Sequence, residues 1–348
     1  MSPAMSAFAL SSIMMFTLCN SEPVPMEHLT LHGVETFVNW SNEQDDQEVM
    51  TVMLLFHGCN NQGYDWFRKP EEISFLREAL SHTISLVAFT TPRHRGNFCW
   101  PSEGSEFEEV RDLIGKALLE LLQLKAKSAS IASSASSSLI LVGASSGGNF
   151  ASRLPAAWSK LQMIKVAAFL SVVSPTSFVR KAELVEEPGP DFPPTGLVYM
   201  PKDKTFASEE AVATLLQSLH GAGVAAKAWP VAPRPVTPRD LSARLKLAGI
   251  SVKEESANEF MEALVDMELV KDGEVMEDPR RVPWHRAVGL LDKDTPLRGE
   301  RRQHRLRCVE EILNRAWAQH EFGSDAEVLQ WLLSHAHGQV GVRTHHEL

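Results

Sequence analysis

The sequence predicts an α/β fold in which a mostly parallel, doubly wound sheet is flanked by helices. Short, nearly continuous apolar runs of strand length recur along the chain, as in parallel strands that are buried on both faces. Stretches with helical spacing of apolar residues separate several of these runs, and this alternation is typical of such sheets. With 348 residues, 44% of them hydrophobic, the chain can also bury a large core.

Six apolar runs are expected to form the strands of this sheet. In chain order they are 51–58, 84–90, 139–145, 166–174, 196–201 and 224–231. One helix is expected at 107–126, directly before the third of these strands. Another is expected at 208–223, with Ser208 as its N-cap and Gly221 as its C-cap.

On sequence grounds the chain has four parts. Residues 1–25 form an N-terminal segment, 26–232 the α/β core, 233–300 a helical insertion, and 301–348 a return to the core. Within the insertion, SANEFMEALVDMELVKDG has apolar residues at about helical spacing. The insertion would either act as a cap that shapes the pocket and excludes water, or form a peripheral subdomain that never touches substrate.

Charge and hydropathy exclude several classes of partner. The formal net charge is −10, and a negative field repels phosphate backbones, so we expect no nucleic-acid partner. The basic run RGERRQHRLR leads into the apolar pattern of a helix and is interpreted as a solvated helix face. No membrane span is expected, because no run has the necessary length. We expect a cytoplasmic protein, while the apolar stretch SAFALSSIMMFTLC leaves organelle targeting or secretion open.

The four cysteines are widely spaced and contain no CxxC pair, which argues against a zinc module or a disulfide scaffold. Cys59 and Cys99 each follow an expected strand end and would be neighbours, but sequence alone cannot show a bond between them. No metal and no organic cofactor is expected. The oligomeric state is left open.

The segment LVGASSGGNF carries the strongest catalytic pattern. Its residues Gly143 to Gly147 fit G-x-S-x-G at a strand-to-helix turn, which favours Ser145 as a nucleophile in strained backbone geometry. Ser146 has Ala144 in place of the first glycine and is better suited to donate its backbone N–H. The alternative is that glycine and serine simply form a turn, but the expected strand before and helix after the motif favour catalysis.

A second strand ends in His57-Gly58-Cys59, and this segment is the expected oxyanion loop. The absence of a side chain at Gly58 lets the backbone approach the reacting carbonyl, and the expected donors are the N–H groups of Cys59 and Ser146. His57 is expected to support this loop and border the substrate pocket rather than act as the base. Trp100 is a further pocket candidate, although a tryptophan more often packs in a core.

The catalytic acid is expected after a late strand. Asp203 lies just past the carboxyl end of such a strand, whereas Asp191 lies before the same strand, at the other edge of the sheet. An ordinary aspartate in a polar turn is the alternative for Asp203. His320, in the loop before an expected terminal helix that begins near Ser324, is the expected base. The weaker candidates for the base are His335, His337, His345 and His346.

The motifs HGCNNQGYDWF, NFCW, LVGASSGGNF, VYMPKD and AQHEFGS together resemble the α/β-hydrolase superfamily, and in particular a group of plant and algal serine-hydrolase-like proteins. The resemblance runs from about Met50 to the final helix and implies the triad Ser145, Asp203 and His320. It implies hydrolysis of an acyl bond in a small-molecule substrate. A carboxylic ester is the expected class, and thioesters and peptides share the chemistry. The alternative is a ligand-binding protein without turnover on the same scaffold.

Overall fold

The computed structural model describes most of the chain. The described ranges are 23–41, 49–92, 97–128, 136–160, 166–174, 191–204, 207–292, 298–317 and 326–338. Four features singled out from the sequence lie outside these ranges: His320, Ser324, most of the N-terminal segment (1–22) and the tail (339–348).

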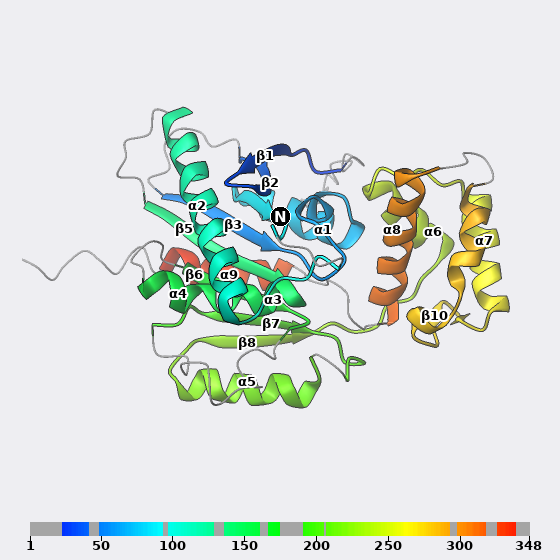
Figure 1. Cartoon of the computed structure of the whole chain (residues 1–348). Coiled ribbons are helices and arrows are strands. Elements are labelled where there is room, and N and C mark those ends of the chain that lie inside the picture. Colours follow the sequence, from blue (N-terminus) through cyan, green and yellow to red (C-terminus); the bar gives the residue numbers. More distant parts are fainter. Residues whose placement is uncertain are drawn as a thin grey trace, which may run out of the picture.

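An eight-stranded sheet lies at the centre of the larger lobe (Figure 1). Its spatial order is β1-β2-β4-β3-β5-β6-β7-β8, and all pairs from β4 to β8 are parallel. The strands are β1 (Glu27–Leu31), β2 (Val34–Asn39), β3 (Val49–Phe56), β4 (Ser85–Phe89), β5 (Ser136–Ala144), β6 (Val166–Val172), β7 (Thr195–Tyr199) and β8 (Ala226–Pro230). The six strands expected from the sequence are therefore confirmed, and the fold is that of an α/β hydrolase.

Helices cover both faces of this sheet, as the alternation along β3 shows. Met53 and Leu55 face one apolar cluster, which includes residues of α1 (Pro70–Ser81) and α9 (Ala326–Gly338). Leu54 faces the opposite cluster. The helices on that side are α2 (Gly104–Ser128), α3 (Ser146–Ala151) and α4 (Leu154–Lys160), and α5 (Glu209–Gly221) packs on β7 and β8. Burial on both faces explains why these strands are apolar throughout.

Two local features differ from the sequence-based expectations. The edge hairpin of β1 and β2 was not expected, and it turns at His32 and Gly33, which both have positive φ. The Ser208 side chain accepts the Ala211 N–H at 3.3 Å, so the expected N-cap of α5 is confirmed. Gly221, however, is the last helical residue, and the left-handed conformation falls on Gly223 instead, at φ +78°.

The insertion forms a second, smaller lobe beside α1 (Figure 1). It contains α6 (Pro238–Leu247), α7 (Glu254–Asp266), the short strands β9 (Val270–Lys271) and β10 (Glu274–Val275), the 3-10 helices η2 (Pro279–Arg281) and η3 (Trp284–Asp292), and α8 (Glu300–Trp317). Its own apolar cluster extends from Val236 to Ala316. The packing therefore groups α8 with the insertion, beyond the boundary at residue 300 that was expected from the sequence.

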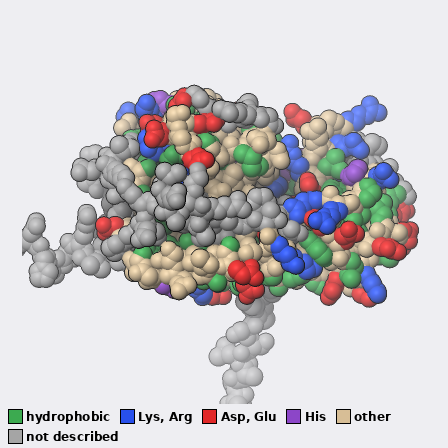
Figure 2. Space-filling model, turned by 60° about the horizontal axis from the view of Figure 1, so that its bottom comes forward, with side chains coloured by type: hydrophobic (Ala, Val, Ile, Leu, Met, Phe, Trp, Pro, Cys, Tyr) green, Lys and Arg blue, Asp and Glu red, His purple; other side chains and the backbone are tan. Residues whose placement is uncertain are grey.

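Charges of both signs are mixed over the surface of the insertion. Figure 2 shows Lys and Arg side chains beside Asp and Glu side chains on one face of this lobe. The basic run near residue 300 lies on α8, whose buried side chains include Val309 and Ile312. Arg301 and Arg302 are exposed, as expected of a solvated face, whereas Arg305 is 2% exposed and donates to the Leu291 carbonyl at 2.8 Å. The expectation of a solvated face is therefore correct for only part of the run.

Candidate active site

Ser145 occupies a strained turn between β5 and α3. Its backbone angles are φ 49° and ψ −117°, outside the regions that non-glycine residues usually adopt. Such a conformation costs about 1–3 kcal/mol and persists only where the surroundings fix it. Here the Ser145 N–H donates to the Val172 carbonyl at 2.9 Å, and the Asn149 N–H donates to the Ser145 carbonyl at 3.1 Å. This geometry is that of a nucleophile elbow.

The two glycines of the motif are required by close backbone packing. A Cβ added at Gly143 would lie 2.5 Å from the carbonyl oxygen of Gly147, and one added at Gly147 would collide with the carbonyl oxygen of Phe56. Both contacts are with backbone atoms, which cannot move aside cheaply. The G-x-S-x-G spacing therefore follows from how tightly α3 folds back over β3 and β5.

Two backbone donors flank Ser145. Gly58 lies against it, since a Cβ built at Gly58 would be 3.4 Å from the Ser145 Cβ. In the part of the chain that the structure describes, neither the Cys59 N–H nor the Ser146 N–H has a hydrogen-bond acceptor. The Ser146 N–H belongs to the first turn of α3, where backbone donors have no intrahelical partner. Both N–H groups are thus free to bind an oxyanion.

His57 supports this loop as a neutral imidazole. Its Nε2 lies 3.2 Å from the Thr91 N–H, which can only donate, so the ring proton is on Nδ1 and is donated to the Gly58 carbonyl at 2.7 Å. Burial lowers the pKa of His57 to about 4. Both ring nitrogens are occupied, which agrees with the expected role in supporting the loop.

A disulfide joins Cys59 of this loop to Cys99, so the two cysteines that sequence placed as neighbours are bonded. The adjacent Trp100 is 4% exposed, and its ring packs on Phe56 and Phe150 in the core. Trp100 is not among the residues that line the cavity at Ser145, so the expectation that it borders the pocket is wrong for this cavity. An indole of this size is better stabilised in the apolar cluster behind the loop.

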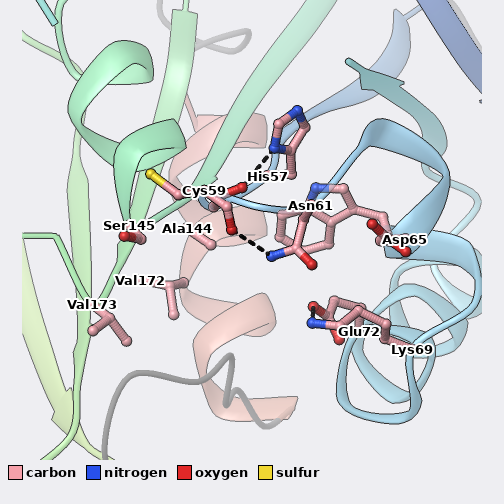
Figure 3. Close-up of a pocket in the computed structure, with 12 residues that line it drawn as sticks. His57, Cys59, Asn61, Asp65, Lys69, Glu72, Ala144, Ser145, Val172 and Val173 are labelled. Atoms are coloured by element: carbon pink, nitrogen blue, oxygen red, sulfur yellow. Dashed lines mark hydrogen bonds and ion pairs between the residues drawn. The ribbon is translucent and has the colours of Figure 1, made fainter. Parts of the chain in front are cut away.

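A cavity of about 160 Å³ opens beside Ser145 (Figure 3). Its lining includes Ala144, Ser145, Val172 and Val173 on the elbow side and His57, Gly58 and Cys59 of the adjacent loop. The rest of the lining is Asn61, Asp65, Trp66, Lys69 and Glu72. His57 therefore borders the pocket, as expected. Sequence reasoning missed the four polar residues Asn61, Asp65, Lys69 and Glu72.

A signal for two of these residues, Lys69 and Glu72, was present in the sequence. In the run Lys69-Pro70-Glu71-Glu72 the proline is the first residue of α1 and the two glutamates lie in its first turn, which is a helix-start pattern. It directly follows the oxyanion loop and the 3-10 helix η1 (Gly63–Phe67). A helix starting there presents its first-turn side chains to the site.

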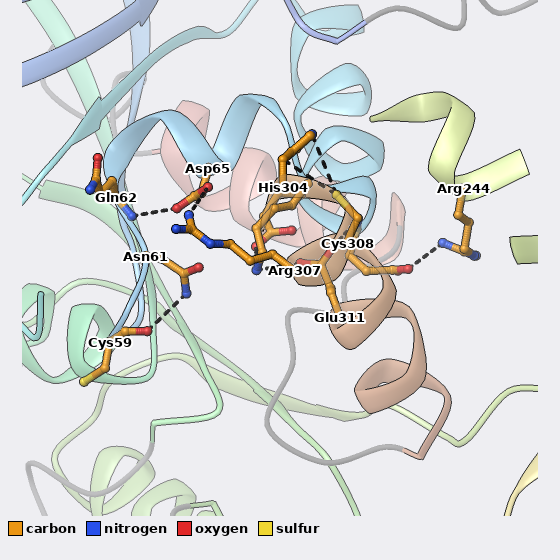
Figure 4. Close-up of polar contacts among 12 residues, drawn as sticks. Cys59, Asn61, Gln62, Asp65, Arg244, His304, Arg307, Cys308 and Glu311 are labelled. Atoms are coloured by element: carbon orange, nitrogen blue, oxygen red, sulfur yellow. Dashed lines mark hydrogen bonds and ion pairs between the residues drawn. The ribbon is translucent and has the colours of Figure 1, made fainter. Parts of the chain in front are cut away.

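Charged side chains form a buried cluster at this end of α1 (Figure 4). Lys69 is 5% exposed, and its Nζ lies 2.9 Å from Glu311 Oε1 and 3.3 Å from Glu72 Oε1. Burial raises the pKa of Glu311 well above its usual range, and Glu72 raises it further, while Lys69 opposes both effects. One lysine therefore pairs with two carboxyl groups, Glu72 and Glu311.

Further ion pairs attach the insertion to α1 and η1. Glu71 binds two arginines, Arg234 and Arg244, the latter at 2.7 Å. Arg307 of α8 lies 3.6 Å from Asp65, whose other oxygen accepts the Gln62 N–H at 2.8 Å. Among the described residues, none from 233–317 lines the cavity itself. The insertion instead contacts the cavity-lining residues Lys69 and Asp65 without reaching the cavity.

Asp203 lies at the same edge of the sheet as Ser145. It follows β7, which is two strands away from β5, and its side chain is 1% exposed. The Ala207 N–H donates to its Oδ2 at 3.2 Å, and its own N–H donates to the Met200 carbonyl at 2.9 Å. Asp191, the rejected alternative, is exposed ahead of β7. The third expected member, His320, lies outside the described residues.

Over the described ranges no group of three or more His, Cys, Asp or Glu side chains has an arrangement that could hold a metal ion. In the same ranges, no helix combines the length and the apolar character needed to cross a membrane.

The chain matches the family model described as "Alpha/beta hydrolase family" over residues 53–318. No curated protein matches it significantly. Similar solved structures include a lipase/esterase from Lactobacillus plantarum (13% identity, 59% of this chain and 91% of the other, TM-score 0.41) and a carboxylesterase from the same species (13%, 78% and 100%, TM-score 0.42). A thermostable carboxyl esterase from Bacillus coagulans is similar at 9% identity over 60% of this chain and 89% of the other (TM-score 0.40).

Proposed function

The chain belongs to the α/β-hydrolase family, and we propose that it is a serine hydrolase that cleaves a carboxylic ester or related acyl bond through an acyl-enzyme on Ser145. One observation carries this proposal. The strained Ser145 lies between two backbone N–H groups, those of Cys59 and Ser146, that have no acceptor among the described residues. A turn that served only to connect β5 to α3 would need neither the strain nor the free donors.

In the first half of the reaction, His320 accepts the proton of the Ser145 hydroxyl as its oxygen attacks the carbonyl carbon. The carbonyl oxygen becomes an oxyanion and is stabilised by the N–H groups of Cys59 and Ser146. His320 then gives the proton to the leaving alcohol, and the acyl group remains on Ser145.

In the second half, water attacks the acyl-enzyme. His320 takes a proton from this water, and the same two N–H groups stabilise the second oxyanion. As this intermediate collapses to the carboxylic acid, the bond to Ser145 breaks and His320 returns the proton to the Ser145 oxygen. Asp203 accepts a hydrogen bond from the imidazole and holds the tautomer that the reaction needs. Its position after β7 and its burial support this role.

The described wall of the cavity favours a short acyl ester that carries a polar group. Asp65, Lys69 and Glu72 offer charged hydrogen-bonding partners across from Ser145, and an alkyl chain placed against them would leave them without water. We propose that the insertion acts on this site by fixing Lys69 and Asp65 through Glu311 and Arg307.

The test of this proposal is hydrolysis of small acyl substrates by the purified protein. Aryl esters, aryl thioesters and peptide anilides of the same short acyl group separate the three acyl classes. We expect a burst of aryl alcohol equal to the enzyme concentration with the ester, absent in Ser145→Ala. Binding of these compounds without turnover by the wild-type protein would favour the alternative, a ligand-binding protein on this scaffold.

A further inference from the structure

The segment from Asn97 to Trp100 is attached to both sides of the oxyanion site. Its Cys99 is bonded to Cys59. The Asn60 N–H donates to the Asn97 carbonyl at 2.6 Å, next to that bond. At its other end, the Trp100 N–H donates to the Ser146 hydroxyl oxygen at 3.4 Å. The same four residues therefore touch the two chain segments that carry the free N–H groups.

This segment is itself fixed in the core. The Trp100 ring is stacked on Phe150 of α3, with ring centroids 4.7 Å apart, and meets Phe56 edge-on at 5.3 Å. Phe56 ends β3, the strand that leads into the oxyanion loop. Because this packing holds residues 97–100 in place, the disulfide to Cys99 restrains the position of Cys59 relative to the core.

The backbone conformation of the oxyanion loop requires support from outside the loop. Asn60, directly after Cys59, is a non-glycine residue at φ 62°. The side chain of Asn61 donates only to the Cys59 carbonyl, at 3.3 Å, within the same loop. The Cys59 N–H belongs to the Gly58–Cys59 peptide, so its orientation depends on what holds Cys59 from outside the loop as well as on the Gly58 carbonyl, which accepts from His57 Nδ1 at 2.7 Å.

We propose that the Cys59–Cys99 disulfide is a positioning element of the oxyanion site, and that opening it lowers turnover while leaving the fold intact. This inference rests on the proposed function. Cys59 and Cys99 are positioning residues, because the bond acts on the oxyanion through the Cys59 backbone N–H. With the bond open, the Cys59 N–H samples orientations away from the developing negative charge. The hydrogen bond to the oxyanion is then weaker, which raises the energy of the transition state.

The bond is also placed where a reductant can reach it, since both cysteines are partly exposed. A dithiol thiolate attacks one sulfur to form a mixed disulfide and release the other cysteine thiolate. The second thiol of the dithiol then displaces the remaining cysteine. The dithiol leaves as its own disulfide, having supplied two electrons, and the protein gains two thiols with two protons. Activity would therefore follow the redox poise of the compartment, since cytosolic thiols are kept reduced and secreted ones are not.

The test compares oxidised wild type, wild type reduced by dithiothreitol, and Cys99→Ser. Peptide mapping establishes the state of the bond in each sample. We expect kcat for a short aryl ester to fall about tenfold or more on reduction, with KM changed less than about twofold, because a donor to the oxyanion acts mainly on the transition state. The rate of labelling by a fluorophosphonate, whose phosphoryl oxygen occupies the same site, should fall by a similar factor.

Three variants separate positioning from other effects. Cys99→Ser should have the low kcat from the start and show no response to dithiothreitol. Cys308→Ala, which removes a buried free thiol in the insertion, should keep both the wild-type activity and the response. A double variant, Cys59→Ala with Cys99→Ala, is used with circular dichroism at the assay temperature, because loss of a cross-link over 40 residues also lowers the melting temperature.

The outcomes are distinct. Unchanged kcat after full reduction would overturn this inference alone, while leaving the proposed function in place. Loss of helical circular dichroism in the double variant would show that the bond serves the whole fold, and would also overturn a specific positioning role. No turnover and no labelling by the oxidised wild type would overturn the proposed function and this inference with it.

Discussion

Gly58 faces Ser145 so closely that a methyl group in its place would lie 3.4 Å from the Ser145 Cβ. That distance is an ordinary van der Waals contact, so alanine fits the space while a branched side chain does not. The backbone that carries the Cys59 N–H is therefore held at contact distance from the proposed nucleophile. The proposed oxyanion site therefore leaves little room for a larger side chain at residue 58.

Gly58→Val should lower kcat by roughly a hundredfold or more with a limited effect on the fold. The branched side chain displaces the Cys59 N–H, and misplacing one oxyanion donor costs about 3 kcal/mol in the transition state. Gly58→Ala is the matched control and should keep most of the activity. Steady-state kinetics of ester hydrolysis measure the effect. Equal activity in a stably folded Gly58→Val would place the oxyanion donors elsewhere.

Asp203→Asn should reduce turnover by about a factor of ten thousand, because an amide favours the imidazole tautomer that cannot accept the serine proton. An asparagine oxygen can still accept the Ala207 N–H, so the fold should survive. Asp191→Asn, at an exposed residue ahead of the same strand, is the control and should be silent. Single-turnover kinetics with both variants give the comparison.

His320→Ala should be at least as damaging as Asp203→Asn, and the double variant little worse than His320→Ala alone, since triad residues act as a unit. Near-full activity in Asp203→Asn would contradict the assignment. If Asp240→Asn or Asp294→Asn then removed activity, the acid would come from the insertion. Asp240 is engaged by Arg244 at 3.0 Å within α6, which argues against it.

The low pKa of His57 predicts a pH-dependent stability. Its value of about 4 lies below the ordinary value of 6.5, so the unfolded chain binds the proton first as the pH falls. This contribution to stability is complete above pH 6.5 and lost between 6.5 and about 4, by about 3 kcal/mol. Urea unfolding of wild type and His57→Asn across this range should show a steeper loss in wild type. Parallel slopes would contradict the buried neutral imidazole.

Lys69→Met should destabilise the protein by about 3 kcal/mol at neutral pH, because it leaves the buried Glu72 and Glu311 without their cation. Adding Glu311→Gln should restore part of the loss. Because burial raises the pKa of Glu311, this carboxyl group takes up a proton earlier than an exposed glutamate as the pH falls, and the cost of Lys69→Met should then shrink. Chemical denaturation of the single and double variants measures both effects. A double variant less stable than Lys69→Met would contradict the shared-cation arrangement.

The strands of the sheet and the elbow at Ser145 could be predicted because each produces a pattern in consecutive residues of the sequence. Buried parallel strands such as β4 and β5 are apolar along their whole length, and the Gly143 to Gly147 spacing is dictated by a turn of five residues. The β1–β2 hairpin escaped prediction because its strands are short and polar on one side. Strands at a sheet edge are not buried on both faces, so they lack the continuous apolar run by which the inner strands were recognised.

The burial and the pairing of the charged residues in the cavity wall could not be predicted, because their contacts join distant parts of the chain. Lys69 and Glu311 are separated by more than two hundred residues, and nothing in the local pattern distinguishes a buried lysine from the exposed ones. Trp100 was misplaced for a related reason. A tryptophan just beyond a strand end can point into a pocket or back into the core, and only packing against Phe56 and Phe150 decides between them.

Ser145 is the proposed nucleophile, and fluorophosphonate labelling followed by peptide mapping is the sharpest test of that role. Labelling needs no knowledge of the natural substrate and forms a covalent bond only with a serine that is deprotonated on attack. We predict that the label is found on Ser145, is abolished in Ser145→Ala, and remains detectable in Ser146→Ala, which keeps its backbone N–H. A label that persists in Ser145→Ala and disappears in Ser146→Ala would contradict the account.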